Sequence, residues 1–177
     1  MNSIQSLASG VQLVGLDVDG TLTDGRIIIG ADGEMAKFFS VRDGLGLRLL
    51  MDAGIAVAII TARESSIVTA RCRELRIDHV LQAVGDKATA LSTLADSLNI
   101  PLSATAFMGD DLPDLPAMQI AGLAACVGNA SAEVRAQANW IADQDGGHGA
   151  VRSFAEMLLK SRGGWAGAIT RFTGDRQ

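Results

Sequence analysis

Two acidic residues, Asp17 and Asp19, lie near the start of the chain, directly after a run of apolar residues. They are two residues apart, so their side chains leave an extended segment in the same general direction, and Gly20 then lets the backbone turn sharply. Carboxylates this close repel each other, so one binds a proton unless a cation neutralises the pair. Mg²⁺ prefers oxygen ligands and bridges readily to phosphate, so it is the natural candidate for this cation. An Asp-rich turn without chemistry is the alternative.

Three further segments carry polar groups after apolar stretches: Thr61-Ala62-Arg63, Lys87 after Gly85-Asp86, and Gly109-Asp110-Asp111-Leu112-Pro113-Asp114. A hydroxyl and backbone amides at a helix start can hold phosphate oxygens. A lysine at a helix N-terminus opposes the helix dipole, which indicates that something else requires it. Several acids after a strand suit a metal ligand with its supporting groups. Taken singly, each segment also fits a helix cap or a solvated side chain, and only their combination is specific.

The elements that position these residues alternate between strands and helices. Short apolar runs predict buried strands at residues 11–16, 56–60, 79–82, 104–108 and 123–127. Helical patterns occupy residues 44–53, 65–75, 87–98 and 112–120. This alternation predicts an α/β fold with a doubly wound parallel sheet. The carboxyl ends of parallel strands meet at one edge, so the polar segments are expected to converge there.

One stretch departs from the alternation. Residues 26–39 predict a β-hairpin around Asp32-Gly33, inserted directly after the first strand. Its Ile and Phe side chains would be partly exposed on an isolated ribbon, which favours burial against another subunit, while folding back onto its own domain is the alternative. We expect one domain over residues 1–162 and a flexible tail over residues 163–177, where no period is visible.

Composition narrows the class of partner. The 177 residues carry a net charge of −5, with a pI of about 4.9, which argues against binding to nucleic acid or to an anionic membrane. No signal peptide is visible, and the longest apolar runs are too short to span a membrane. Cys72 and Cys126 lie far apart without metal-ligand spacing, so a reducing cytoplasm is expected.

The order of an acid pair, a threonine, a lysine and an acid cluster resembles the haloacid dehalogenase superfamily of phosphohydrolases over roughly residues 11 to 150. The resemblance implies that Asp17 is the nucleophile and Asp19 the general acid/base. It also implies that Thr61 and Lys87 hold phosphate, and that Mg²⁺ is bound by Asp17, the Asp19 carbonyl and Asp110. Asp111 and Asp114 would then orient the groups around the metal.

The gaps between these motifs leave no room for a large cap domain, as in the capless branch of the superfamily. Within it, Asp24-Gly25, the segment 39–44, Thr61-Ala62-Arg63, Gly109-Asp110-Asp111-Leu112 and the segment 146–152 resemble the 3-deoxy-D-manno-octulosonate 8-phosphate phosphatase family. That resemblance implies hydrolysis of this eight-carbon sugar-acid phosphate and a homotetramer in which hairpins pack together and neighbouring subunits complete each site. It also implies a substrate site lined by Asp19, Ser40, Val41, Arg42, Asp43, Gly44, Arg48, Arg63, Arg71 and Lys87.

The arginines suit such a substrate independently, since a planar guanidinium matches a sugar carboxylate. Arg63 and Arg71 are eight residues apart, which on one helix would place them on the same face. The chain departs from the family pattern at Ala62, where glycine is usual, at Ser40, where asparagine is common, and at His148, which often is arginine. His148 is interpreted as a loop or interface residue.

Three other functions stay open at this point. A phosphatase for a nine-carbon acidic sugar phosphate uses a similar capless tetramer, and the departures at Ala62, Ser40 and His148 keep it in view. A signalling receiver domain also combines a phosphorylatable Asp with Thr, Lys and magnesium, but it lacks a general acid two residues after that Asp. A noncatalytic scaffold would not need the complete set of polar residues.

Overall fold

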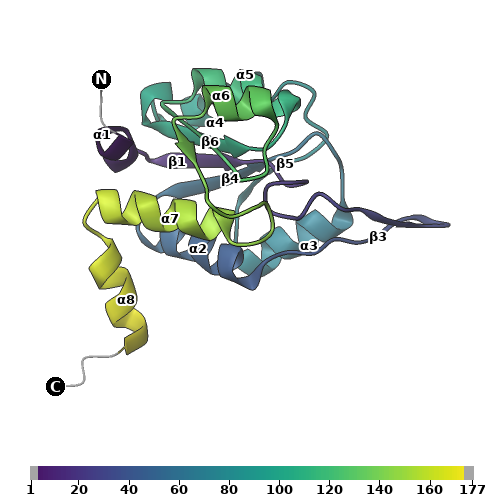
Figure 1. Cartoon of the computed structure of the whole chain (residues 1–177), viewed down its shortest axis with the longest axis horizontal. Coiled ribbons are helices and arrows are strands. Elements are labelled where there is room, and N and C mark those ends of the chain that lie inside the picture. Colours follow the sequence, from purple (N-terminus) through teal and green to yellow (C-terminus); the bar gives the residue numbers. More distant parts are fainter. Residues whose placement is uncertain (1–3, 174–177) are drawn as a thin grey trace.

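A computed structural model of the protein describes residues 4–173, and its centre is a six-stranded parallel sheet (Figure 1). Along the sheet the strands follow the order β5-β4-β1-β6-β7-β8. They are β1 (Leu13–Leu16), β4 (Ala56–Ile60), β5 (His79–Leu81), β6 (Thr105–Gly109), β7 (Leu123–Cys126) and β8 (Trp140–Ile141). The strand order reverses direction on either side of β1, so the predicted doubly wound sheet is confirmed.

Helices cover both faces of the sheet (Figure 1). One face carries α2 (Val41–Asp52), α3 (Ser66–Leu75) and α7 (Ala150–Ser161), and the other carries α4 (Lys87–Ser97), α5 (Leu115–Ile120) and α6 (Ala132–Gln137). The remaining helices are α1 (Ile4–Ser9), α8 (Trp165–Thr173) and the short 3-10 turns Leu102–Ala104 and Leu112–Asp114. Because both faces are covered, every residue of β1, β6 and β7 is buried, which explains why these strands read as continuous apolar runs.

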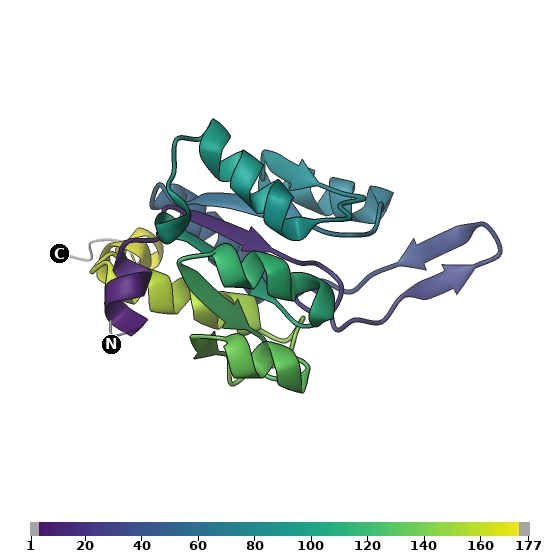
Figure 2. The ribbon, with the colours of Figure 1, turned by 90° about the horizontal axis from the view of Figure 1, so that it is seen from above.

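The predicted hairpin is also confirmed. Strands β2 (Ile28–Gly30) and β3 (Gly33–Ala36) pair antiparallel and extend far beyond the carboxyl ends of the sheet strands (Figure 2). Ile29 is 69% exposed, Met35 67% and Phe38 61%. The alternative in which the ribbon folds back onto its own domain is therefore wrong, and the apolar side chains are available to a partner.

Two boundaries differ from the prediction for local reasons. Helix α2 begins three residues earlier than expected because Ser40 caps it, its hydroxyl accepting the N–H of Asp43 at 3.3 Å. The segment expected to lack regular structure forms α8, whose Arg171 pairs with Asp52 of α2 at 2.9 Å. The mobility of this tail stays a prediction, and residues 1–3 and 174–177 of the expected domain and tail lie outside the described residues.

Helices α1, α6 and α7 were absent from the sequence prediction. The most important omission is α7, which packs along α2 and buries Val151, Phe154 and Leu158. It begins at the glycine-rich segment 146–149, which places that segment beside the carboxyl end of β1, as described below. Within residues 4–173, no helix is both long and apolar enough to cross a membrane.

Candidate active site

The polar segments that follow β1, β4 and β6 converge on one cleft at the carboxyl edge of the sheet. Within the part of the chain that the structure describes, the cleft is lined by Asp17, Asp19, Thr61, Ala62, Arg63, Lys87, Asp110, Asp111, Pro113 and Asp114. The parallel register places the last residues of β1 beside those of β4 and β6, so the side chains that follow these strands emerge together. The hairpin leaves the sheet at this same edge (Figure 2).

Lys87 is a buried cation in the cleft that pairs with two of its carboxylates. Its side chain is 4% exposed, and its ammonium donates to Asp17 Oδ1 at 2.5 Å and to Asp114 Oδ1 at 2.6 Å. Burial alone would lower the pKa of Lys87, but the charges of Asp17 and Asp114 outweigh it and the pKa is raised. Lys87 therefore stays charged at neutral pH, and its interpretation as a solvated surface lysine is wrong.

Three carboxylates cluster at Lys87, which pairs with two of them, Asp17 and Asp114. One oxygen each from Asp17, Asp110 and Asp114 lies within 4.8 Å of the other two. Burial, together with the charge of Asp114, raises the pKa of Asp17 to about 6. Burial and the charges of Asp17 and Asp114 raise the pKa of Asp110 to about 7. One lysine does not neutralise the cluster, and a hard divalent cation with oxygen ligands fits the remaining charge.

Asp114 has two roles in this arrangement. Its Oδ2 accepts the backbone N–H of Asp110 at 2.9 Å and that of Asp111 at 3.2 Å, while its Oδ1 contacts Lys87. Asp114 therefore shapes the loop that presents Asp110, and its supporting role around a metal stays a prediction. Asp110 itself is held by Thr21, whose hydroxyl donates to Oδ1 at 3.2 Å.

Two glycine segments hold the loop that follows β1. Gly20 has a φ of +102°, and a Cβ there would lie 2.2 Å from Asp110 Oδ2. A Cβ on Gly146 would lie 1.7 Å from the Gly20 carbonyl oxygen, and Gly147 donates its N–H to Thr21 O at 3.1 Å. Only glycine permits these approaches, so segment 146–149 clamps the loop that carries Asp19. His148 lies in this clamp, its Nδ1 2.8 Å from the Gly146 carbonyl oxygen.

Asp19 brings an unexpected residue into the site. Its Oδ1 pairs with the ammonium of Lys37, and its Oδ2 lies 3.6 Å from Arg63 Nε. The Lys37 side chain is fully buried and also pairs with Glu34 Oε1 at 2.7 Å. Sequence reasoning missed Lys37, and no pattern could have found it, because residues 34 and 37 would fall on opposite faces of a regular strand.

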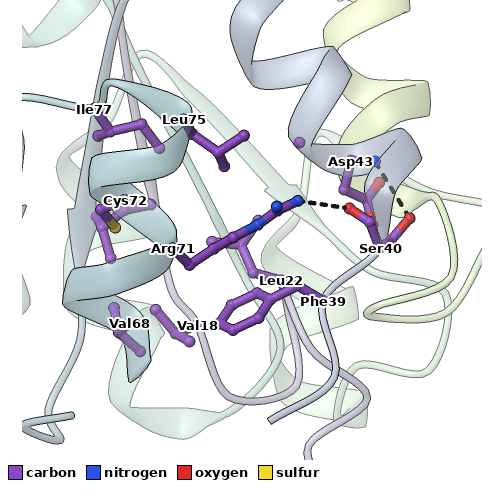
Figure 3. A pocket seen from close by; sticks show the side chains of 12 residues that line it. Val18, Leu22, Phe39, Ser40, Asp43, Val68, Arg71, Cys72, Leu75 and Ile77 are labelled. Atoms are coloured by element: carbon purple, nitrogen blue, oxygen red, sulfur yellow. Dashed lines mark hydrogen bonds between the residues drawn. The ribbon is translucent and has the colours of Figure 1, made fainter. Parts of the chain in front are cut away.

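Several predicted substrate residues lie elsewhere in the single chain. Ser40, Asp43, Gly44 and Arg71 line a separate, mainly apolar cavity between α2 and α3 (Figure 3). Arg71 donates to the Ser40 carbonyl oxygen at 3.3 Å, and its guanidinium lies 5.8 Å from the centre of the Phe39 ring. Arg63 precedes α3 and lines the cleft, so the prediction that both arginines share one helix face is wrong.

Asp43 is fully engaged within its own chain. Its carboxylate accepts the backbone N–H of Arg152 at 2.7 Å and that of Gly149 at 3.2 Å, and so holds the start of α7. Burial raises the pKa of Asp43, although these N–H groups oppose the shift. Val41 and Arg42 are exposed on α2, and Arg48 is half-buried further along it. Among the residues described, none from Ser40 to Arg48, nor Arg71, lines the same chain's cleft.

Comparisons with known proteins identify the family to which this chain belongs. A model of haloacid dehalogenase-like hydrolases matches residues 77–153. The 3-deoxy-D-manno-octulosonate 8-phosphate phosphatase KdsC of Escherichia coli K12 is 41% identical over 156 residues, covering 88% of this chain and 83% of the relative. The chain belongs to the haloacid dehalogenase-like hydrolases. The Haemophilus influenzae phosphatase of the same name is 37% identical, covering 90% of this hydrolase and 89% of the relative.

Solved structures agree with the sequence relatives. The 3-deoxy-D-manno-octulosonate 8-phosphate phosphatase of Moraxella catarrhalis, in complex with magnesium ion, phosphate ion and a KDO molecule, is 44% identical with a TM-score of 0.94. The match covers 97% of this hydrolase and 99% of that chain. The cobalt-bound phosphatase from Haemophilus influenzae is 35% identical, with a TM-score of 0.89, covering 92% and 98% of the two chains. The likeness therefore extends over the sheet, the helices and the hairpin.

Proposed function

We propose that this hydrolase is a magnesium-dependent phosphatase that converts 3-deoxy-D-manno-octulosonate 8-phosphate to 3-deoxy-D-manno-octulosonate and phosphate, a step that supplies a lipopolysaccharide precursor. The observation that carries the proposal is the cluster of Asp17, Asp110 and Asp114, two of which pair with Lys87, in a chain that shares its whole fold with phosphatases of this name. The family membership leaves the receiver-domain hypothesis without support, because the matching proteins are hydrolases.

Asp17, Asp19, Thr61 and Lys87 divide the reaction between them. An oxygen of Asp17 attacks phosphorus, and the bond to the sugar oxygen breaks as Asp19 donates a proton to it. Asp19 then takes a proton from the water that hydrolyses the aspartyl phosphate and releases inorganic phosphate. Thr61 and Lys87 hold the equatorial oxygens of the transferred group. Lys87 reaches Asp17 at 2.5 Å and thus also orients the nucleophile.

Magnesium fits the donor set of the cleft. Asp17 and Asp110, with the Asp19 carbonyl, would hold Mg²⁺, and Asp111 and Asp114 would orient the surrounding groups. When bound, Mg²⁺ offsets the charge between the Asp17 carboxylate and the substrate phosphate. The raised pKa values of Asp17 and Asp110 support this assignment, since they indicate negative charge that the protein leaves unneutralised.

The sugar-acid part of the substrate needs more room than the phosphate. A second hollow shares Ala62, Lys87 and Pro113 with the cleft and opens beside it. Arg63 is half exposed at the rim, where its guanidinium can bind a carboxylate. We further propose that Ser40–Gly44, Arg48 and Arg71 contribute from a neighbouring subunit, which is consistent with their distance from the cleft of their own chain.

A homotetramer that associates through the hairpins completes this proposal. Exposed apolar residues on the ribbon and just beyond it, Ile28, Ile29, Met35, Phe38 and Val41, support it. Light scattering is expected to give about four times the chain mass of 18.4 kDa. The double substitution Ile29→Asp and Phe38→Asp should reduce the assembly size, whereas Ile169→Asp on α8 should not. A wild-type monomer that is fully active would contradict the tetramer.

We also place the enzyme in the cytoplasm.

The catalytic proposal is tested by phosphate release from the eight-carbon substrate, with and without Mg²⁺. Asp17→Asn is expected to lower kcat by at least about 10⁴-fold because it removes the attacking group. Asp32→Asn at the exposed hairpin tip serves as the matched control and should retain activity. Near-normal turnover of Asp17→Asn would refute the mechanism. A larger kcat/KM for a nine-carbon acidic sugar phosphate would reassign the substrate.

A further inference from the structure

A buried chain of polar contacts joins the catalytic cleft to the hairpin. Lys37 lies between β3 and α2, at the base of the hairpin, and its side chain has no exposed area. Its ammonium contacts Asp19 on one side and Glu34 Oε1, at 2.7 Å, on the other. A fully buried ammonium is costly unless carboxylates compensate it, and here two of them do.

The end of this series of polar contacts that is farther from the cleft, Glu34, is fixed to α3. Glu34 Oε2 accepts a hydrogen bond from the hydroxyl of Ser65, the residue that caps the N-terminus of α3. The Ser65 backbone N–H donates to Gln82 Oε1 at 2.7 Å, so the capping residue is itself held from a second side. Glu34, and through it Lys37, is therefore braced against the body of the domain although both belong to the hairpin segment.

The two oxygens of Asp19 have different surroundings. Oδ1 accepts from Lys37, whereas Oδ2 lies near Arg63, whose side chain is 48% exposed and lines the cleft. The Lys37 ammonium is buried and makes the closer contact, so Oδ1 is held in place, while Oδ2, 3.6 Å from Arg63 Nε, stays accessible to the cleft. Oδ2 is therefore the oxygen placed to give a proton to the leaving oxygen.

We propose that Lys37, braced by Glu34 and Ser65, is a positioning residue that orients the Asp19 carboxyl group for proton transfer to the leaving oxygen. The inference rests on the proposed phosphatase function and adds a residue outside the expected catalytic set. In the first step the Asp17–phosphorus bond forms, the phosphorus–oxygen bond to the sugar breaks, and the proton on Asp19 Oδ2 moves to that oxygen. Without Lys37, half-exposed Arg63 is the remaining side-chain partner of Asp19 among the residues described, and Asp19 can turn its proton away from the cleft.

The sharpest test compares leaving groups. A sugar alkoxide needs the proton from Asp19, whereas p-nitrophenolate leaves as a stable anion and does not. For Lys37→Met, kcat/KM for the eight-carbon sugar-acid phosphate is expected to fall about 10²-fold, the usual contribution of a general acid, while kcat/KM for p-nitrophenyl phosphate falls less than about threefold. This constant reports the first chemical step, so the later hydrolysis of the aspartyl phosphate does not obscure the comparison.

Matched variants separate orientation from damage to the fold. Lys160→Met removes an exposed lysine and should change neither constant. Lys37→Arg keeps the charge and should recover part of the loss. Glu34→Gln should give a smaller loss with the same dependence on the leaving group, and it carries the test if Lys37→Met does not fold. Asp19→Asn is the reference, and adding Lys37→Met to it should cost little more, because both changes disable the same proton transfer.

Each outcome decides the inference. An equal fall for both esters in Lys37→Met and Glu34→Gln, or no fall for either, would overturn the positioning role while leaving the phosphatase proposal intact. Additive losses in the double variant would also overturn it. A wild-type enzyme that releases phosphate from neither ester with Mg²⁺ present would instead refute the proposed function, and the inference with it.

Discussion

Magnesium binding to this hydrolase is expected to depend steeply on pH close to neutrality. Burial and neighbouring charges raise the pKa of Asp17 to about 6 and that of Asp110 to about 7, so protons compete with the metal for both carboxylates. Between pH 8 and pH 6 this competition weakens the apparent affinity about tenfold through Asp110 and about twofold through Asp17, or about 20-fold together. With ordinary pKa values, both groups would be ionised at pH 6 and the affinity would hardly change.

Isothermal titration with MgCl₂ at pH 6 and pH 8, at constant ionic strength, measures this ratio directly. Asp111→Asn removes an exposed acid that contributes little to the pKa of Asp110, so the ratio should stay near 20-fold. Asp114→Asn removes a charge that raises both pKa values, so the ratio should shrink. Dissociation constants that agree within about threefold at the two pH values would refute the reasoning from buried, uncompensated carboxylates.

Two further predictions concern the supports of the site. Asp43→Asn should lower the free energy of unfolding, measured in urea, by about 2 kcal/mol, because the amide replaces a carboxylate that accepts two N–H groups at the start of α7. A loss no larger than that of Asp32→Asn would contradict this prediction. Gly146→Ala should lower kcat/KM more than tenfold, because the added Cβ would collide with the Gly20 backbone. The control Gly10→Ala should leave kcat/KM unchanged, and equal activity of the two variants would argue against the role of segment 146–149 in holding the loop.

The parts of the site that follow strand ends could be predicted from sequence. Asp17, Thr61 and Asp110 each come directly after an apolar strand, and a parallel sheet brings such positions to one edge whatever the loop details. The hairpin was equally predictable, because an Asp-Gly pair between two β-rich runs is a local signal. Fold and cleft therefore follow from patterns that span only a few residues each.

The remaining features depend on contacts between distant segments. The resemblance implies a substrate role for Asp43, but no sequence pattern indicates that its carboxylate holds the backbone of Gly149 and Arg152 at the start of α7. Lys37 reads as an ordinary charged residue on a ribbon, and only the fold around the hairpin base buries it against Asp19. Helix α8 begins at Trp165, and Arg152 and Lys160 of α7 both lie against the ring of this residue. No periodicity in residues 163–177 indicates this contact.

The glycine clamp has a consequence for how the enzyme matures. Segment 146–149 is far along the sequence from the loop at Gly20 and Thr21 that it holds, so this contact closes one of the longest loops in the fold. Contacts of such high sequence separation form late, since the chain must lose much entropy before they stabilise it. A nascent chain that has emerged only as far as β7 can build most of the sheet, yet its nucleophile loop lacks this support. We therefore expect catalytic competence to arise late in folding, after the start of α7 has docked.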